Sequence, residues 1–336
     1  MARFHKLKIK DIRRETDSCV SIAFDIPGEL REEFAYKQGQ YVTLKVVRDG
    51  QEYRRSYSAC SSPVVDEDLR IAVKRVEGGK VSTYLNNGLQ PGMELEVMKP
   101  MGNFHTEMPA PTPKHYVAFV AGSGITPVMS LLKTALATHP ENKFTLFYGN
   151  RSYRDVIFKA ELDDRSNAHS DRFQVHYILS RESTDDPLFT GRMDSDKCDA
   201  LISRFIRTHE VDEFLICGPF EMINTRRGHL ISKGVSIDHI HFELFTTELA
   251  GAEAATAETE AGDGEGGGNE PVDEARVVIV LDGEETEITV HKGESILDAA
   301  LDAGLDAPYA CTGGSCCTCR AKKMEGDAIM DVNYAL

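Results

Sequence analysis

A stretch of 29 residues in the last third of the chain, 247–275, contains almost no large apolar side chain and cannot contribute to a hydrophobic core. Ala, Glu and Gly dominate its composition, and it carries nine acidic residues without a single Lys or Arg. Such a segment behaves as a flexible linker, with a random-coil span of about 30 Å at this length. The 336-residue chain is therefore expected to fold as a body, 1–246, and a separate C-terminal module, 276–336.

The net charge of −16 is spread unevenly along the chain. Residues 276–336 carry eleven acidic and five basic side chains, so the linker and module together hold almost all of the negative charge and the body is nearly neutral. This distribution argues against nucleic-acid binding and suits docking to a basic protein surface, although it also serves solubility. The sequence contains no run of 18 apolar residues and no secretory signal, so we expect no membrane association and a cytoplasmic location.

The body contains two different hydrophobic patterns. Residues 1–110 hold short β-type runs, at 20–24, 41–44, 69–73 and 94–97, which predict an antiparallel β-barrel. Residues 111–246 alternate apolar strands, at 117–121, 144–148, 175–179 and 214–217, with helical patterns, which predict a parallel α/β domain. In the module, two β-type runs flank an Asp282-Gly283 turn, and a helix capped by Ser295 follows. This order predicts a β-grasp-like module.

Three cysteines of the module, Cys311, Cys316 and Cys319, follow the spacing C-x4-C-x2-C. A tight loop with this spacing can direct its thiolates at a [2Fe–2S] cluster, and the small residues 313–315 let backbone N–H groups approach the sulfurs. Cys317 adjoins a ligand position, so its side chain should point elsewhere. The plant-type pattern includes a fourth cysteine further along, and we expect the chain to stop before it. Zinc binding, or partner binding without a redox role, stays an alternative for this module.

The motif R-x-Y-S at residues 55–58 ends one of the predicted barrel strands. Tyr57 offers an aromatic face to a flavin ring, Ser58 offers a hydroxyl near its reactive nitrogen, and Arg55 brings a guanidinium to a pyrophosphate. A second element at residues 79–82 begins a helix whose backbone N–H groups can face the same anion. The flavin-binding residues predicted from these two elements are Arg55, Tyr57, Ser58, Gly79, Val81 and Ser82.

Two further elements lie at the ends of strands in the second domain. The run G-S-G-I-T-P at residues 122–127 opens a helix, with Thr126 as its expected N-cap and Pro127 at the first helical position. Its glycines, Gly122 and Gly124, allow a dinucleotide pyrophosphate to approach the backbone. The run C-G-P-x-x-M at residues 217–222 places Cys217 at the carboxyl end of a strand.

Taken together, these elements resemble those of the ferredoxin–NADP reductase superfamily. The resemblance implies FAD in the barrel and nicotinamide beside Cys217, with Phe245 closing the domain against the flavin. It implies catalytic roles for Tyr57, Ser58, Cys217 and Glu243. The residues expected at the dinucleotide are Gly122, Gly124, Thr126, Pro127, Cys217, Gly218, Pro219 and Met222.

The coenzyme preference depends on exposed basic residues. The run S-R-E at residues 180–182 resembles the family element that binds the 2′-phosphate of NADPH, and a guanidinium can grip a phosphate through two hydrogen bonds. Arg181, with Ser180 and Arg151, therefore favours NADPH, with NADH as the alternative.

The order of flavin barrel, nucleotide domain, linker and ferredoxin module resembles reductases of multicomponent oxygenases. The segment 326–336 most resembles the reductase subunits of phenylacetyl-CoA epoxidases. The resemblance implies a relay from NADPH through FAD and the [2Fe–2S] cluster to the oxygenase component of a multisubunit monooxygenase, a di-iron enzyme of phenylacetate catabolism. Reductases of Rieske oxygenases, steroid hydroxylases or hybrid-cluster proteins are the alternatives.

Overall fold

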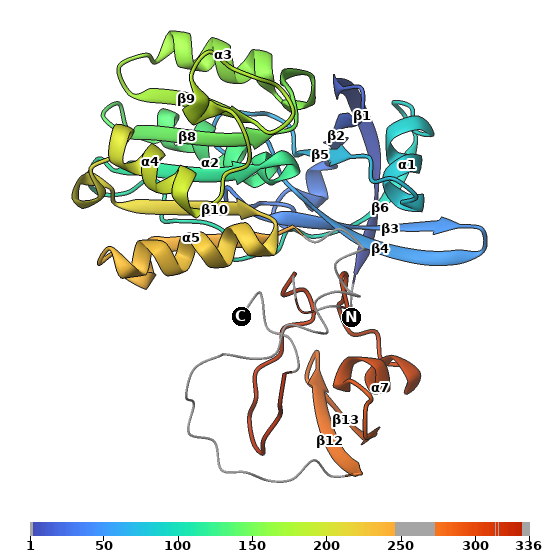
Figure 1. Cartoon of the computed structure of the whole chain (residues 1–336). Helices are drawn as coiled ribbons and strands as arrows, with labels where there is room; N and C mark the ends of the chain where they lie inside the picture. The colour runs from blue at the N-terminus through green and yellow to red at the C-terminus, as the bar shows by residue number, and fades with distance from the viewer. Residues whose placement is uncertain (1–2, 246–272, 313, 315, 331–336) are drawn as a thin grey trace.

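The computed structural model of the chain describes residues 3–245, 273–312, 314 and 316–330, and it has three parts (Figure 1). Most of the predicted linker, up to residue 272, lies outside the described residues, as do Gly313, Ser315 and the end of the 326–336 segment.

The first part is a six-stranded antiparallel sheet with the strand order β4-β3-β6-β1-β2-β5. A bridge between Ala59 and Ile71 joins its two outer strands, so the sheet curls into a barrel as predicted. A buried apolar cluster fills the barrel, and helix α1 packs on it through Val81 and Leu85. Its elements are β1 (Phe4–Thr16), β2 (Cys19–Asp25), β3 (Tyr41–Arg48), β4 (Gln51–Ser58), β5 (Arg70–Lys74), α1 (Lys80–Asn87) and β6 (Glu94–Met98).

The second part is a five-stranded parallel sheet with the order β11-β10-β7-β8-β9. Helices α2 and α3 pack into the cluster on one face and α4 and α5 into the cluster on the other, which is the predicted α/β architecture (Figure 1). Its elements are β7 (His115–Ala121), α2 (Ile125–Thr138), β8 (Lys143–Asn150), α3 (Lys159–Ala168), β9 (Phe173–Leu179), α4 (Ser195–Phe205), β10 (Glu213–Gly218), α5 (Phe220–Ser232) and β11 (Ile240–Leu244).

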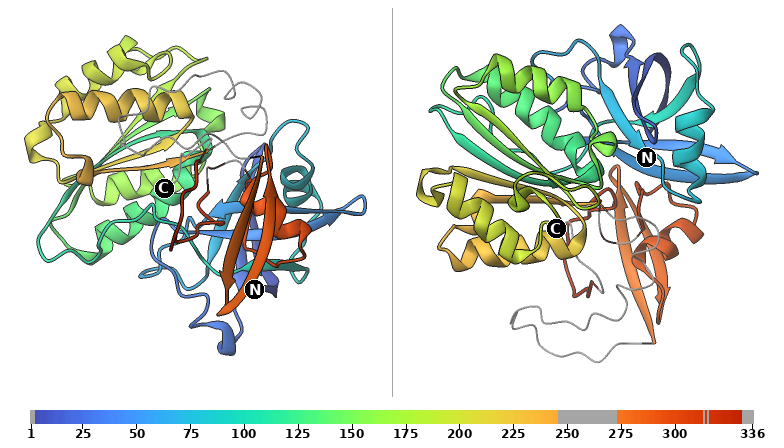
Figure 2. Two further views of the ribbon diagram at one scale, coloured as in Figure 1. Left: turned by 90° about the horizontal axis from the view of Figure 1, so that it is seen from below. Right: turned by 45° about the horizontal axis from the view of Figure 1, so that its top comes forward.

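The third part is the C-terminal module, which lies against the barrel (Figure 2). Strands β12 (Glu274–Leu281) and β13 (Glu284–His291) form the predicted hairpin, and helix α7 (Ile296–Asp302) packs on one face of it. Ser295 caps this helix as expected, because its Oγ accepts a hydrogen bond from the Asp298 amide at 3.0 Å. The first two residues of β12, Glu274 and Ala275, belong to the linker that the composition predicted.

Candidate electron-transfer site

The barrel and the α/β domain meet at two predicted catalytic side chains. Ser58 ends β4 and is buried, and its hydroxyl donates a hydrogen bond to Glu243 Oε2 on β11 at 3.1 Å. Burial raises the pKa of Glu243 to about 8, and the hydrogen bond from Ser58 partly offsets this rise. At neutral pH the Glu243 carboxyl therefore holds a proton most of the time, at the boundary between the two domains.

The other two residues of the R-x-Y-S motif lie on the opposite face of β4 from Ser58, because side chains alternate along a strand. Tyr57 packs against the edge of the barrel core and remains partly exposed. Arg55 Nη1 donates to the neighbouring carbonyl of Arg54 at 2.8 Å, and its guanidinium lies 5.9 Å from the ring centroid of Tyr53. The motif therefore presents an aromatic ring and a cation on one side and a hydroxyl on the other.

The start of helix α1 is shaped by Gly79 and Ser82. A Cβ on Gly79 would lie 2.6 Å from Ser82 Oγ, so only glycine fits there without a shift. Ser82 Oγ accepts a hydrogen bond from the Val76 amide at 3.1 Å, so this hydroxyl holds the turn. No side chain caps the helix at Gly79, and its first turn contains no acidic residue. The backbone N–H groups near Val81 are therefore the groups that suit a pyrophosphate here.

The glycine turn of the α/β domain differs from the expectation in two respects. Gly122–Gly124 form a 3-10 turn, η2, which continues directly into α2 at Ile125, with Gly124 at the N-cap position. Thr126 is therefore not the N-cap, and its hydroxyl donates to the Ser123 carbonyl at 3.0 Å. Pro127 falls at the third helical position, still within the first turn, where a missing N–H costs nothing.

The glycine turn packs directly on the strand end that carries Cys217. A Cβ on Gly124 would lie 2.4 Å from the Cys217 carbonyl oxygen, and one on Gly218 would lie 2.6 Å from Met222 Cε. The Phe245 amide donates to the Gly218 carbonyl at 3.2 Å, which brings the end of β11 to the same place. Cys217 is fully buried, and burial raises the pKa of its thiol, so it stays neutral. Pro219 begins the turn into α5 beside these residues.

The loops that follow β8 and β9 run side by side at the same edge of the sheet. The Ser180 amide donates to the Asn150 carbonyl at 2.9 Å, and the Arg181 amide donates to the Arg151 carbonyl at 2.8 Å. Both arginine side chains are exposed. The buried amide group of Asn150 has no hydrogen-bond partner on either its nitrogen or its oxygen. Because buried polar groups are normally paired, this amide and the bare glycine turn fit a polar ligand such as a dinucleotide.

One residue at this edge was not predicted from the sequence. Lys74 ends β5 in the barrel, and its ammonium lies 3.7 Å from the position that a Cβ on Gly122 would take. Burial lowers its pKa, Asp155 opposes this effect and Arg151 adds to it. In the sequence, Lys74 stands out only by its position directly after the apolar run 69–73.

The cysteine loop of the module brings two of its predicted ligands, Cys311 and Cys316, into contact. The Cys316 thiol is hydrogen-bonded to Cys311, and this contact and burial raise its pKa. The Cys316 thiol also donates to Thr318 Oγ1 at 3.2 Å, whereas Cys319 is exposed. Cys317 turns toward the barrel instead, with its Sγ 3.7 Å from the hydroxyl of Tyr41. Among the described residues, no three His, Cys, Asp or Glu side chains form a ready site for one metal ion. The loop carries three of the four thiolates that a plant-type [2Fe–2S] cluster takes.

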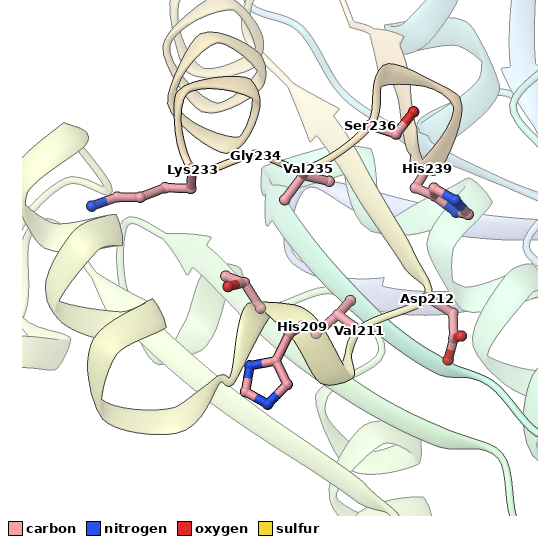
Figure 3. Close-up of a pocket in the computed structure, with 9 residues that line it drawn as sticks. His209, Val211, Asp212, Lys233, Gly234, Val235, Ser236 and His239 are labelled. Carbon is pink, nitrogen blue, oxygen red and sulfur yellow. The ribbon is translucent and has the colours of Figure 1, made fainter.

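A separate hollow of about 330 Å³ lies at the amino ends of β10 and β11, opposite the edge that carries Gly122 and Cys217 (Figure 3). Most of its lining side chains are polar and exposed, including His209 and His239. None of the predicted site residues lines it.

Comparison with known families matches all three parts of the chain. The model of an oxidoreductase FAD-binding domain matches residues 6–106. That of an oxidoreductase NAD-binding domain matches residues 119–227. That of a 2Fe-2S iron-sulfur cluster binding domain matches residues 279–335.

Two curated relatives are similar along almost the whole chain. A subunit of the 1,2-phenylacetyl-CoA epoxidase of Escherichia coli K12 is 38% identical over 100% of this chain and 91% of its own length. The ferredoxin reductase component of 3-ketosteroid-9-alpha-monooxygenase from Rhodococcus rhodochrous is 32% identical over 97% of this chain and 87% of its own.

Among solved structures, an intact type IV self-sufficient cytochrome P450 monooxygenase shares the fold with a TM-score of 0.62. It is 20% identical, and the match covers 94% of this chain and 35% of that one. In the part of the chain that the structure describes, no helix has the length and apolar character needed to cross a membrane.

Proposed function

Because the chain belongs to the family of FAD-, NAD- and [2Fe–2S]-binding reductase components of multicomponent oxygenases, we propose that it carries electrons from NADPH to a partner oxygenase. The observation that supports this role most strongly is the hydrogen bond from Ser58 to Glu243. It joins the flavin motif of the barrel to the nucleotide domain, next to the cysteine loop of the module.

When bound, FAD accepts a hydride from the nicotinamide and the [2Fe–2S] cluster carries single electrons onward. The chain's own residues supply binding and orientation. Arg55 and the backbone N–H groups at the start of α1 would hold the flavin pyrophosphate, and the ring of Tyr57 would pack on the flavin. Cys311, Cys316 and Cys319 supply three thiolates to the cluster.

The dinucleotide is proposed to bind across the carboxyl edge of the parallel sheet. The turn at Gly122 and Gly124 takes the pyrophosphate, and the unpartnered amide of Asn150 and the ammonium of Lys74 supply hydrogen bonds beside it. The exposed guanidiniums of Arg151 and Arg181, with the hydroxyl of Ser180, take the 2′-phosphate that distinguishes NADPH from NADH.

The proton at the domain boundary is proposed to serve flavin reduction. Glu243, with a pKa of about 8, holds a proton at its carboxyl and shares a hydrogen bond with Ser58. This pair can therefore supply or accept a proton beside the flavin. The neutral thiol of Cys217 lines the nicotinamide side of the same space without adding charge.

The partner is proposed to be the oxygenase component of a phenylacetyl-CoA epoxidase. The support is the 38% identity over the whole chain with a subunit of that enzyme in Escherichia coli. Because the relay consumes NADPH, we place the protein in the cytoplasm. A second candidate partner is a steroid monooxygenase, because a 3-ketosteroid-9-alpha-monooxygenase reductase is 32% identical over 97% of this chain.

The test is an anaerobic titration of the purified full-length chain with NADPH, followed by absorption, with iron and sulfide assayed on the same sample. Bleaching of flavin bands together with iron and sulfide supports the relay. Zinc without iron and sulfide contradicts it, and the absence of flavin overturns the assignment of Arg55, Tyr57 and Ser58. Transfer of electrons to purified epoxidase and steroid oxygenase components then separates the two partners.

A further inference from the structure

One face of the β3–β4 hairpin carries Ser58 of the flavin motif together with the contacts to the ferredoxin module. Directly opposite residues in an antiparallel pair share a face. The register pairs Tyr41 with Ser58 and Lys45 with Arg54. Alternation along β4 then places Arg54 and Ser58 on the same side, the side on which Ser58 reaches Glu243. Tyr41, Arg54 and Ser58 therefore face one space.

The first contact between barrel and module is made by Tyr41. Its hydroxyl lies 2.8 Å from Thr318 Oγ1 and donates to the Cys316 carbonyl. The ring is only 4% exposed, and a Cβ on Gly102 would lie 2.9 Å from it, so the side chain is held in one position. A tyrosine of the barrel thus touches the backbone of a predicted cluster ligand.

The second contact is made by Arg54. Its guanidinium lies 4.1 Å from the ring centroid of Tyr309, two residues before Cys311, and 5.1 Å from that of Phe4 in the barrel. Glu52 Oε1 fixes the guanidinium through Nε at 2.9 Å. The side chain is only 11% exposed, so the cation is largely desolvated between two aromatic rings, the condition in which such contacts are strongest.

Building on the proposed relay, we propose that Tyr41 and Arg54 form a two-point latch that docks the cysteine loop beside the flavin. The latch holds both ends of the loop, through Tyr309 before Cys311 and through Thr318 before Cys319. Tyr41 lies directly opposite Ser58, so the docked loop sits on the face of the hairpin where Ser58 meets Glu243. Tyr41 and Arg54 act as positioning residues for single-electron transfer from reduced FAD to the oxidised cluster. Hydride transfer depends on the body alone and should not need the latch.

The test uses the full chain with Tyr41→Phe and Arg54→Gln, and with Tyr53→Phe as the matched control. The Tyr53 hydroxyl bonds Gln51 Oε1 at 2.7 Å and the Lys80 ammonium, and neither partner belongs to the module. Hydrogen–deuterium exchange of peptides from residues 305–320 should rise in the two latch variants and not in the control. In stopped flow, cluster reduction should slow about three- to tenfold, with flavin reduction by NADPH unchanged.

Latch variants that match Tyr53→Phe in both exchange and cluster reduction would overturn the proposal. If NADPH did not reduce the flavin of the parent protein, the relay itself would be overturned. This outcome is measured on the parent protein and needs no variant. If Tyr41→Phe also loses flavin reduction, the proposal is tested with Arg54→Gln and Tyr309→Leu. These variants each remove one partner of the contact between Arg54 and Tyr309. Their double variant should then be no slower than the worse single variant, whereas additive losses contradict a shared contact.

Discussion

The two-domain body and the C-terminal module differ in how their sites are built. In the body, large apolar clusters lie on both sides of the parallel sheet and inside the barrel, and the glycine turn packs directly on Cys217. In the described part of the module, the apolar cluster has only Ile288, Ala299 and Ala300 as buried members. Val278 and Val280, on the outer face of its hairpin, are more than half exposed.

This difference indicates two sources of stability. The body forms its nucleotide edge from packing and backbone hydrogen bonds among its own residues. A core as small as that of the module supplies little folding free energy, and small domains of this kind commonly depend on a bound metal group or on docking. Changes in the module should therefore leave the body's chemistry intact, and changes in the body away from Tyr41 and Arg54 should leave the cluster in place.

The largest effect is expected from Cys316→Ser. Loss of one of three neighbouring thiolates should remove the cluster, so transfer to a one-electron protein acceptor should fall to background. NADPH-dependent reduction of a small soluble dye should persist, because the body does not rely on the module. Cys317→Ser is the control, since its thiol faces Tyr41, and it should keep iron and sulfide at parent levels. Cys316→Ser protein with both activities intact would contradict the assignment.

Gly124→Ala should have the opposite effect, impairing the body while leaving the module intact. The added Cβ would lie 2.4 Å from the Cys217 carbonyl oxygen, a backbone atom that cannot move alone, so the variant should lose about 1–3 kcal/mol of stability and bind NADPH weakly. Iron and sulfide content should not change. Gly228→Ala in α5, where nothing lies within 4 Å, should instead gain about 0.5–1 kcal/mol. Thermal melts measure the stability of both variants, and flavin reduction rates measure their use of NADPH. A Gly124→Ala protein that melts at the temperature of the parent would contradict the close contact.

A smaller effect, limited to one ligand, is expected from Arg181→Ala. The exposed guanidinium contributes nothing to the core, so the melting temperature should stay unchanged. The KM for NADPH should rise about tenfold, in line with loss of hydrogen bonds to a charged group, and the KM for NADH should change little. Arg207→Ala, exposed at the other edge of the domain, is the control. Equal changes for both coenzymes would refute a role at the 2′-phosphate.

The elements of both regions could be predicted from local patterns, whereas the contacts between regions could not. Alternation and glycine punctuation located the barrel and sheet strands, and cysteine spacing located the cluster loop. Thr126 was wrong as an N-cap because the glycines before it already form a turn of helix. The approach of Lys74 to Gly122, and that of Tyr41 to Thr318, join segments far apart in the chain. Such pairs depend on how domains pack, which no local spacing records.

The last prediction concerns the boundary where the regions meet, at Glu243. Its pKa in the folded chain, about 8, lies above its usual value of 4.5, so the folded state binds more protons between these pH values. Its contribution to stability is therefore fully present below pH 4.5 and is lost as pH rises through 8. Glu243→Gln cannot titrate, so its stability relative to the parent should increase from pH 5 to pH 8, as measured by denaturant unfolding. The variant should also lose any inflection near pH 8 in the rate of flavin reduction. A stability difference independent of pH would mean that Glu243 is ionised in the folded protein and supplies no proton at the boundary.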